Sequence, residues 1–253
     1  MRLLAIQNPF NAPVYHEETV SSTMDIARLL AAQGEKHGAV ITADFQEAGR
    51  GRVRERPWNM ERGNNLPFTI LLRYGRIEAI PAAITLRSGL ALAHAIEDFV
   101  PALSGRVMIK WPNDIMIGSK KAAGILAEAE GGNVFTGIGI NVAQQEFPPA
   151  LRDKAVSLGS AAGIAIAPET RFTLLETILA RLYRELAASD WRGRLLERLY
   201  KKGEQVCFID GGAGSNRAIE GRLEGIGPGG ELLITPNGEN CARAFVTGEL
   251  RVY

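Results

Sequence analysis

The spacing of apolar residues predicts helices in four stretches of the chain. The first begins near residues 22–25, Ser-Thr-Met-Asp, which fit the Ser/Thr-x-x-Asp/Glu capping pattern, and Gly34 is its expected stop. Pro81 is expected to open a second helix. Apolar residues three and four positions apart predict a strongly amphipathic helix over residues 169–188, and a further helical stretch covers residues 191–202.

Shorter apolar runs that are bounded by turn residues predict strands. The N-terminal half holds two of them, at residues 39–43 and 66–72, with a loop rich in Gly, Arg and Asn at residues 46–65 between them. Four more follow in close order at residues 107–111, 115–117, 120–130 and 134–142. Short turns separate the last three, so we expect an antiparallel meander rather than a simple βαβ repeat.

The pattern changes at Gly203. From there, five short β runs alternate with turns such as Gly227-Pro228-Gly229-Gly230. About fifty residues in five short strands are typical of a small barrel. We therefore expect two domains, residues 1–202 and residues 203–253.

Composition and charge narrow the class of protein. Hydrophobic residues make up 46% and charged residues 23% of the 253 residues, which is typical of a globular protein with a proper core. The formal net charge is +1, whereas a dedicated nucleic-acid binder is usually strongly basic. The first nine residues hold too short an apolar run for a signal peptide, and we expect no run long enough to cross a bilayer. The cytoplasm is the expected location.

Residues 46–58 are the first candidate for chemistry. Four arginines fall within seven residues, and Gly49 and Gly51 precede the first two of them. Glycine lets a backbone approach a ligand closely, and arginine offers planar, permanently charged donors suited to phosphate. The segment also fits a solvated basic loop or a nucleic-acid patch, but the glycines and the final Trp58 favour a loop that closes over a ligand. The spacing of a Walker A loop is absent.

Two further candidates lie on consecutive predicted strands. Residues 110–114, Lys-Trp-Pro-Asn-Asp, end a strand in a corner. This is either only a good turn, or it places Asp114 at the reacting atoms as a base or as a partner of a metal–phosphate. Alternation puts Lys121 on the same face as Ala123 and Ala127. A lysine there either extends to solvent or points a charge into a pocket.

The fourth candidate is the strand Gly-Ile-Gly-Ile-Asn-Val at residues 137–142. Its second, fourth and sixth residues share one face, which predicts core. The other face carries Gly137, Gly139 and Asn141, where two glycines would form a flat floor for a planar ligand and Asn141 would add a donor and an acceptor. A bulge-prone edge strand is the alternative.

Together and in this order, these groups resemble the biotin–protein ligase family. The family pattern has a Ser-Thr start to the first helix, a Gln before a Gly-Arg-Gly-Arg loop that ends in Trp, a Lys-Trp-Pro-Asn-Asp corner, a Lys followed by Gly-Ile-Leu, and a Gly-Ile-Gly-Ile-Asn strand. The matching residues are Ser22-Thr23, Gln46 with Gly49–Trp58, Lys110–Asp114, Lys121 with Gly124–Leu126, and Gly137–Asn141. The resemblance covers most of the chain, and the combination is highly specific.

The resemblance implies an α+β fold, with a mixed-sheet ligase domain of the biotin/lipoate ligase type and a small C-terminal SH3-like β-barrel. It implies a reaction in which the biotin carboxylate attacks the α-phosphate of ATP, giving biotinyl-AMP and pyrophosphate, and a lysine of a carrier then attacks the acyl-adenylate. The implied cofactors are ATP and Mg²⁺, with biotin as substrate. The implied partner is a biotin carboxyl carrier protein or the carrier domain of a biotin-dependent carboxylase. No nucleic-acid or membrane partner is expected, and a homodimer stays open.

The resemblance also implies residue roles. Lys121, Arg50 and Asp114 are the expected catalytic residues, since the two cations offset the repulsion between anions and Asp114 could help deprotonate the incoming lysine. The expected biotin-binding residues are Ser22, Thr23, Gln46, Arg50, Gly51, Arg52, Lys121 and Gly124. The expected nucleotide-binding residues are Arg52, Arg56, Trp58, Asn113, Lys121, Gly137, Gly139 and Asn141. No residue is expected to ligate a metal.

Three features depart from the family pattern. Met24 stands where Asn often follows Ser-Thr, so one hydrogen bond to biotin is missing or is supplied elsewhere. The arginine loop is one residue longer than its commonest form, and Arg56 rather than Arg54 is the better match to its last arginine. Regulatory members carry an N-terminal helix-turn-helix domain, for which Ser22 comes too early, so we expect a ligase without a repressor role.

Three rival interpretations are less favoured. Lipoate–protein ligases and octanoyl transferases resemble this fold, but their Arg-Arg-x-Ser-Gly-Gly segment is absent. A biotin-responsive regulator would need a DNA-binding module. A β-rich binding module would account for the C-terminal strands alone.

Overall fold

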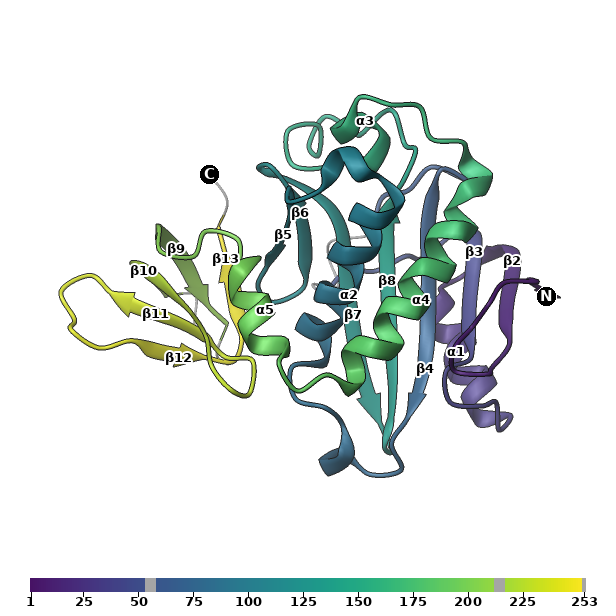
Figure 1. The fold of residues 1–253 in the computed structure, drawn as a ribbon, viewed down its shortest axis with the longest axis horizontal. Helices are drawn as coiled ribbons and strands as arrows, with labels where there is room; N and C mark the ends of the chain where they lie inside the picture. The colour runs from purple at the N-terminus through teal and green to yellow at the C-terminus, as the bar shows by residue number, and fades with distance from the viewer. Residues whose placement is uncertain (53–57, 212–216, 252–253) are drawn as a thin grey trace.

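The computed structural model describes residues 1–52, 58–211 and 217–251, and their strands form two sheets that lie side by side (Figure 1). The larger, eight-stranded sheet has the order β1-β2-β3-β4-β8-β7-β6-β5. Its β2–β3 pair is parallel and its other pairs are antiparallel, which confirms the mixed sheet. The smaller, five-stranded sheet is antiparallel and has the order β12-β11-β10-β9-β13.

The strands of the larger sheet are β1 (Arg2–Leu3), β2 (Val14–Val20), β3 (Val40–Gln46), β4 (Asn65–Arg73), β5 (Val107–Lys110), β6 (Asp114–Ile117), β7 (Lys120–Glu130) and β8 (Asn133–Asn141). The α-helices are α1 (Thr23–Ala32), α2 (Ile84–Phe99), α3 (Leu158–Ala162), α4 (Arg171–Ala187) and α5 (Trp191–Glu197). Single 3₁₀ turns lie at Ile77–Ala79, Pro101–Leu103 and Pro168–Thr170. The smaller sheet consists of β9 (Gln205–Asp210), β10 (Ala218–Ile226), β11 (Leu232–Pro236), β12 (Arg243–Phe245) and β13 (Gly248–Leu250).

Helices cover both faces of the larger sheet, and the sequence of β4 explains why. Helices α2 and α4 pack together on one face, and α1 covers part of the other (Figure 1). Phe68, Ile70 and Leu72 point toward α2 and α4, whereas Leu71 packs with α1. Burial of each such side chain stabilises the fold by about 1.5–3 kcal/mol. A strand buried on both faces needs a nearly continuous apolar run, which is the pattern of residues 66–72 apart from Thr69.

The helix predictions hold with two corrections. Helix α4 lies within the predicted residues 169–188. Helix α2 begins at Ile84 and not at Pro81, after Ala83 with a φ of 56°. Helix α5 ends at Glu197 and not at residue 202. The reason is that residues 198–200 extend along β5, where the Ile109 N–H donates to the Arg198 carbonyl at 2.8 Å and the Tyr200 N–H to the Ile109 carbonyl at 2.9 Å.

The expectation that no apolar run could cross a bilayer was wrong by length and composition. The 23-residue segment Ile77–Phe99 is long enough and contains an 18-residue stretch with a mean hydropathy of 1.4. A buried core helix gives the same pattern, and Leu90, Leu92 and Ile96 of α2 are fully buried between the sheet and α4.

The smaller sheet is attached to the larger one at the Lys-Trp-Pro-Asn-Asp corner. The Trp111 Nε1–H donates to the Gly230 carbonyl at 2.9 Å, and its ring lies 6.0 Å from that of Phe208. Five antiparallel strands agree with an SH3-like domain, although β12 and β13 do not pair within the described ranges, so no closed barrel is formed there. The domain boundary at residue 203 stays a prediction, and the first strand of this sheet starts at Gln205.

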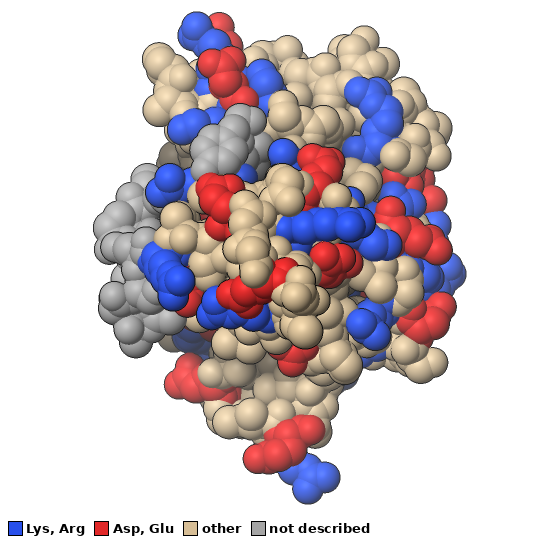
Figure 2. Space-filling model, turned by 90° about the vertical axis from the view of Figure 1, so that its left-hand side faces the viewer, with Lys and Arg blue, Asp and Glu red and all other residues tan. Residues whose placement is uncertain are grey.

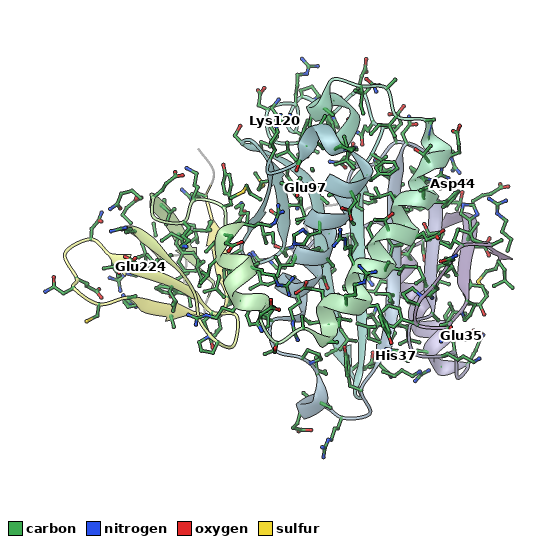
Figure 3. The ribbon with its side chains drawn as sticks, viewed as in Figure 1. Glu35, His37, Asp44, Glu97, Lys120 and Glu224 are labelled. Carbon is green, nitrogen blue, oxygen red and sulfur yellow. The ribbon has the colours of Figure 1, made fainter. Side chains whose placement is uncertain are left out.

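Charged side chains of both signs are interspersed over this end of the molecule (Figure 2), in keeping with the net charge of +1. Titratable side chains also lie at the two ends of the larger sheet. Lys120 lies at one end, as the first residue of β7, whereas Glu35 and His37 lie at the other, after α1 (Figure 3).

Candidate active site

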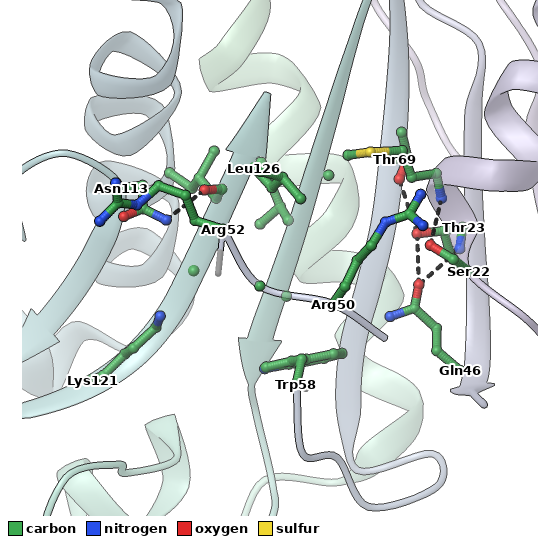
Figure 4. A pocket seen from close by; sticks show the side chains of 17 residues that line it. Ser22, Thr23, Gln46, Arg50, Arg52, Trp58, Thr69, Asn113, Lys121 and Leu126 are labelled. Carbon is green, nitrogen blue, oxygen red and sulfur yellow. Dashed lines mark hydrogen bonds between the residues drawn. The ribbon is translucent and has the colours of Figure 1, made fainter. Parts of the chain in front are cut away.

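A pocket opens on the α1 side of the larger sheet (Figure 4). Its walls come from the start of α1, the end of β3, the middle of β4, the described part of the arginine loop (residues 49–58), the corner after β5, the first half of β7 and the middle of β8. The lining residues are Ser22, Thr23, Met24, Gln46, Arg50, Gly51, Arg52, Trp58, Thr69, Asn113, Lys121, Gly124, Ile125, Leu126, Gly137, Ile138 and Gly139. Segments more than one hundred residues apart in the chain therefore meet at one cavity.

One wall of the pocket is a polar cluster of Thr23, Gln46 and Thr69. The Gln46 Oε1 accepts from the Thr23 N–H at 2.8 Å and from its hydroxyl at 3.0 Å. The Thr23 and Thr69 hydroxyl oxygens lie 2.9 Å apart. Oε1 is already engaged as an acceptor. The amide N–H groups of Gln46 are therefore the part of this side chain that is left to bind a ligand, as donors. Ser22 caps α1 and accepts from the Met24 N–H at 3.3 Å, as the capping pattern predicts.

The described residues of the arginine loop that line the pocket are Arg50, Gly51, Arg52 and Trp58. The two ends of the loop are joined by a hydrogen bond from the Trp58 N–H to the Gly49 carbonyl at 2.9 Å. Arg50 Nη2 donates to Asp25 Oδ1 on α1 at 2.6 Å. Arg52 Nη2 donates to the Gly248 carbonyl on β13 at 2.8 Å. The predicted nucleotide ligand Arg56 lies outside the described residues, so its placement stays a prediction.

Asp114 lies just behind the opposite wall, where it links Lys121, which lines the pocket, to Lys110, which does not. Its Oδ1 lies 2.6 Å from Lys121 Nζ, and its Oδ2 lies 4.0 Å from Lys110 Nζ. Lys110 is buried, and burial lowers its pKa, although the charges of Asp114 and Glu249 oppose this effect. The Asp114 carboxylate is thus engaged by cations. This geometry suits a residue that orients Lys121, and its predicted role as a base stays a prediction.

The predicted orientation of Lys121 needs correction. Strand alternation placed it on the face of Ala123 and Ala127, but those residues pack in the core on the α2 side. A β-bulge lies between the pairs Ile115–Ala123 and Met116–Lys121 and reverses the face. Lys121 therefore points into the pocket above Gly124, where an added Cβ would lie 3.0 Å from Nζ.

The predicted glycine floor on β8 is present. The strand is central, between β4 and β7, so the edge-strand alternative was wrong. A Cβ on Gly137 would lie 2.9 Å from Cε of Met24, and one on Gly139 would lie 2.8 Å from the Trp58 ring. Both glycines are therefore needed for close approach by a neighbouring side chain. Met24 and Trp58 are the groups that rest on this floor.

The structure brings most of the predicted site residues together. All eight predicted biotin-binding residues line the pocket, as do six of the eight predicted nucleotide-binding residues: Arg52, Trp58, Asn113, Lys121, Gly137 and Gly139. Asn113 Nδ2 is used in the fold, where it donates to the Ile125 carbonyl at 2.9 Å.

Asn141 and Thr69 differ from the sequence-based expectation. Asn141 is buried just beyond the lining, where Nδ2 donates to the Val156 carbonyl at 3.3 Å and Oδ1 has no hydrogen-bond partner among the described residues. Thr69 was missed. Its signal was a hydroxyl in the middle of an otherwise apolar strand, where a buried polar group needs a partner.

Carboxylates that could ligate a metal are scarce at this pocket. Within the described ranges no three His, Cys, Asp or Glu side chains are grouped to hold an ion. The residues present do not fit a protein-held magnesium ion, and we assign no chemical step to one.

The comparisons with known proteins agree with this geometry. The model of the biotin/lipoate A/B protein ligase family matches residues 17–144, just over half of the chain. This chain belongs to that family. The biotin–[acetyl-CoA-carboxylase] ligase of Paracoccus denitrificans is 33% identical over 81% of this chain and 88% of its own length.

Two further members of the ligase family show how far the likeness extends. The bifunctional ligase/repressor BirA of Bacillus subtilis is 40% identical over 59% of this chain, and the match spans 47% of BirA, so this chain covers about half the length of that relative. The solved biotin protein ligase from Aquifex aeolicus, in complex with biotin and ATP, is 27% identical and superposes with a TM-score of 0.80 over 95% of this chain and 99% of its own. The predicted fold is confirmed over both sheets.

Proposed function

We propose that this protein activates biotin with ATP and transfers the biotinyl group to a lysine of a biotin carboxyl carrier protein or carrier domain. The observation that carries the proposal is the pocket itself, which places the polar wall of Thr23, Gln46 and Thr69 opposite Lys121, with Arg50 and Arg52 at its mouth. The family and the ligands named for the Aquifex structure support the same substrates.

The residues have distinct tasks in this proposal. The polar wall binds the ureido ring of biotin through the Gln46 amide and the threonine hydroxyls. Arg50, Arg52 and Lys121 stabilise the carboxylate and the α-phosphate, two anions that must approach each other. We assign Trp58, on the Gly139 floor, to the nucleotide, together with the Asn141 Oδ1, which has no hydrogen-bond partner among the described residues.

The proposed reaction has two steps, adenylation of biotin and transfer to the carrier lysine, and neither needs a further reactant. A carboxylate oxygen of biotin forms a bond to the α-phosphorus, and the bond from that phosphorus to the bridging oxygen of pyrophosphate breaks. The amine of the carrier lysine then forms a bond to the acyl carbon, AMP leaves, and the amine loses one proton. Mg²⁺ enters as a counterion carried by the phosphates. A cytoplasmic location belongs to the same proposal because ATP is a substrate.

The test uses the full chain with ATP, Mg²⁺, biotin and a carrier domain, and it follows pyrophosphate release and carrier mass. We expect one biotinyl group on one carrier lysine, with lipoate far less active. Lys121→Met should slow biotinyl-AMP formation at least tenfold, because a charge-assisted bond of about 1.5–3 kcal/mol is lost. Lys120→Met is the matched control, since Lys120 Nζ donates to the Arg152 carbonyl outside the pocket and should be dispensable. Absence of adenylate and of transfer in the unmodified protein would reject the proposal.

A further inference from the structure

A network of alternating charges runs across α1 to the arginine loop. Arg50 Nη2 lies 2.6 Å from Asp25 Oδ1, and Arg28 Nη1 lies 3.7 Å from the same oxygen. Arg28 in turn pairs with Glu128 on β7 and lies 5.1 Å above the Phe135 ring. Asp25 is therefore held between two arginines and has an anchored neighbour on the helix.

The carboxylate of Asp25 does not do what the capping pattern predicts. In a capping box, the acidic side chain of the third helical residue returns to the N–H of the capping residue. Here the described hydrogen bonds of Asp25 go to Arg50 instead, while Ser22 caps the helix by itself. An acidic residue is favourable in the first helical turn through the helix dipole, so the charge is stabilised locally and is aimed at the loop.

Helix α1 also contributes Thr23 to the polar wall. Thr23 is fixed by Gln46 and Thr69, and Asp25 follows two residues later on the same rigid helix. A guanidinium has five N–H donors, so the bond to Asp25 leaves others for the pocket that Arg50 lines (Figure 4). The position of Arg50 is thereby set relative to the wall that binds the other end of the substrate.

We propose that Asp25 is a positioning residue, which holds the Arg50 guanidinium in register with the polar wall so that an entering carboxylate meets a preset donor. The inference rests on the proposed function, because the carboxylate of biotin is the anion that Arg50 receives. Ordering the donor before binding lowers the entropy that binding must offset.

The chain offers a closely matched control. Asp98 and Arg181 form an ion pair at 2.5 Å with 41% and 36% side-chain exposure, against 42% and 38% for Asp25 and Arg50. We expect Asp25→Asn to raise the KM for biotin by about two- to fivefold with kcat nearly unchanged, the range given by exposed ion pairs. Asp98→Asn should leave both constants unchanged, and Asp25→Glu should restore part of the affinity.

A double-mutant cycle tests whether Asp25 acts through Arg50. In an Arg50→Ala background, Asp25→Asn should have no further effect on KM. An unchanged or lowered KM in Asp25→Asn, or an additive effect in the double variant, would overturn the inference. A lowered KM would mean that Asp25 competes with the substrate for Arg50.

A ligand-free measurement separates this inference from the proposed function. Tryptic cleavage after Arg50 and Arg52, with no biotin or ATP present, should be faster in Asp25→Asn than in the control Asp98→Asn. Equal cleavage rates would reject the positioning role even if the enzyme makes biotinyl-AMP. Failure of the unmodified protein to make biotinyl-AMP would reject the proposed function, whereas faster cleavage in the variant would still show that Asp25 holds the loop.

Discussion

Replacing Asp114 with Asn tests the geometry of the charged wall most directly. The substitution keeps the size of the side chain and removes its charge. Lys121 Nζ then loses its partner at 2.6 Å, and Lys110 Nζ loses a carboxylate at 4.0 Å. Lys121 at the pocket and the buried Lys110 behind it then lose the carboxylate that they share.

The size of the effect follows from exposure. A charge-assisted hydrogen bond contributes about 1.5–3 kcal/mol, and Lys121 is 40% exposed, so the lower end of the range applies. About 1.5 kcal/mol corresponds to a roughly tenfold slower biotinyl-AMP formation. The buried Lys110 loses a longer contact, which should destabilise the fold by about 1–2 kcal/mol.

The assay separates the two half-reactions. Pyrophosphate release measures adenylate formation, and transfer from preformed biotinyl-AMP to the carrier measures the second step. Denaturant unfolding from pH 7 to 10 gives an independent readout. Burial lowers the pKa of Lys110, so in the window below the unfolded value the unfolded state binds more protons and stability rises with pH. In Asp114→Asn this rise should begin at a lower pH, because an opposing charge has been removed.

Two results would refute the reasoning. Normal adenylate formation in Asp114→Asn would show that Lys121 needs no orienting carboxylate. Normal adenylate formation with a slow transfer step would instead favour Asp114 as the base for the incoming lysine.

Three more predictions follow from single contacts. Gly139→Ala should displace the ring of Trp58, because the added Cβ would lie 2.8 Å from it. The affinity for ATP, measured by titration of tryptophan fluorescence, should fall at least several-fold. An unaltered affinity would count against the glycine floor as part of a nucleotide site. Glu35→Gln should lower the pKa of Tyr15 from about 12 toward 10, because the 2.5 Å hydrogen bond from Tyr15 to the Glu35 carboxylate raises this pKa. An ultraviolet titration in which none of the five tyrosines changes its pKa would contradict this prediction. Trp111→Phe should lower the free energy of unfolding by about 1 kcal/mol, because it leaves a half-buried acceptor without its donor, and an unchanged denaturant midpoint would argue against this contact.

Local patterns predicted the elements well where a single physical rule decides them. The apolar spacing of α4 and the alternation of isoleucines and glycines in β8 both appeared as expected. Capping by Ser22 is equally local. These features depend on neighbours within a few residues, which the sequence displays directly.

Contacts between distant segments could not be predicted in this way. The bulge that turns Lys121 into the pocket depends on the register between two strands, and strand alternation alone gave the wrong face. The hydrogen bond between the Thr23 and Thr69 hydroxyls joins residues 46 positions apart. The pairing of Asp25 with Arg50 replaced a local cap with a tertiary contact. In each case the partner is selected by the fold rather than by neighbouring residues.

Arg52 lines the pocket and also donates a hydrogen bond to the Gly248 carbonyl of β13, in the smaller sheet. The two contacts are thermodynamically linked. If a bound ligand stabilises this position of Arg52, it also strengthens the hydrogen bond to β13, and the hydrogen bond to β13 strengthens ligand binding by the same free energy. The stability of the smaller sheet's contact with Arg52 would then depend on whether the pocket is occupied, although this sheet does not form the floor of the pocket. Removing it would change the affinity for small substrates as well as any surface it offers to a carrier.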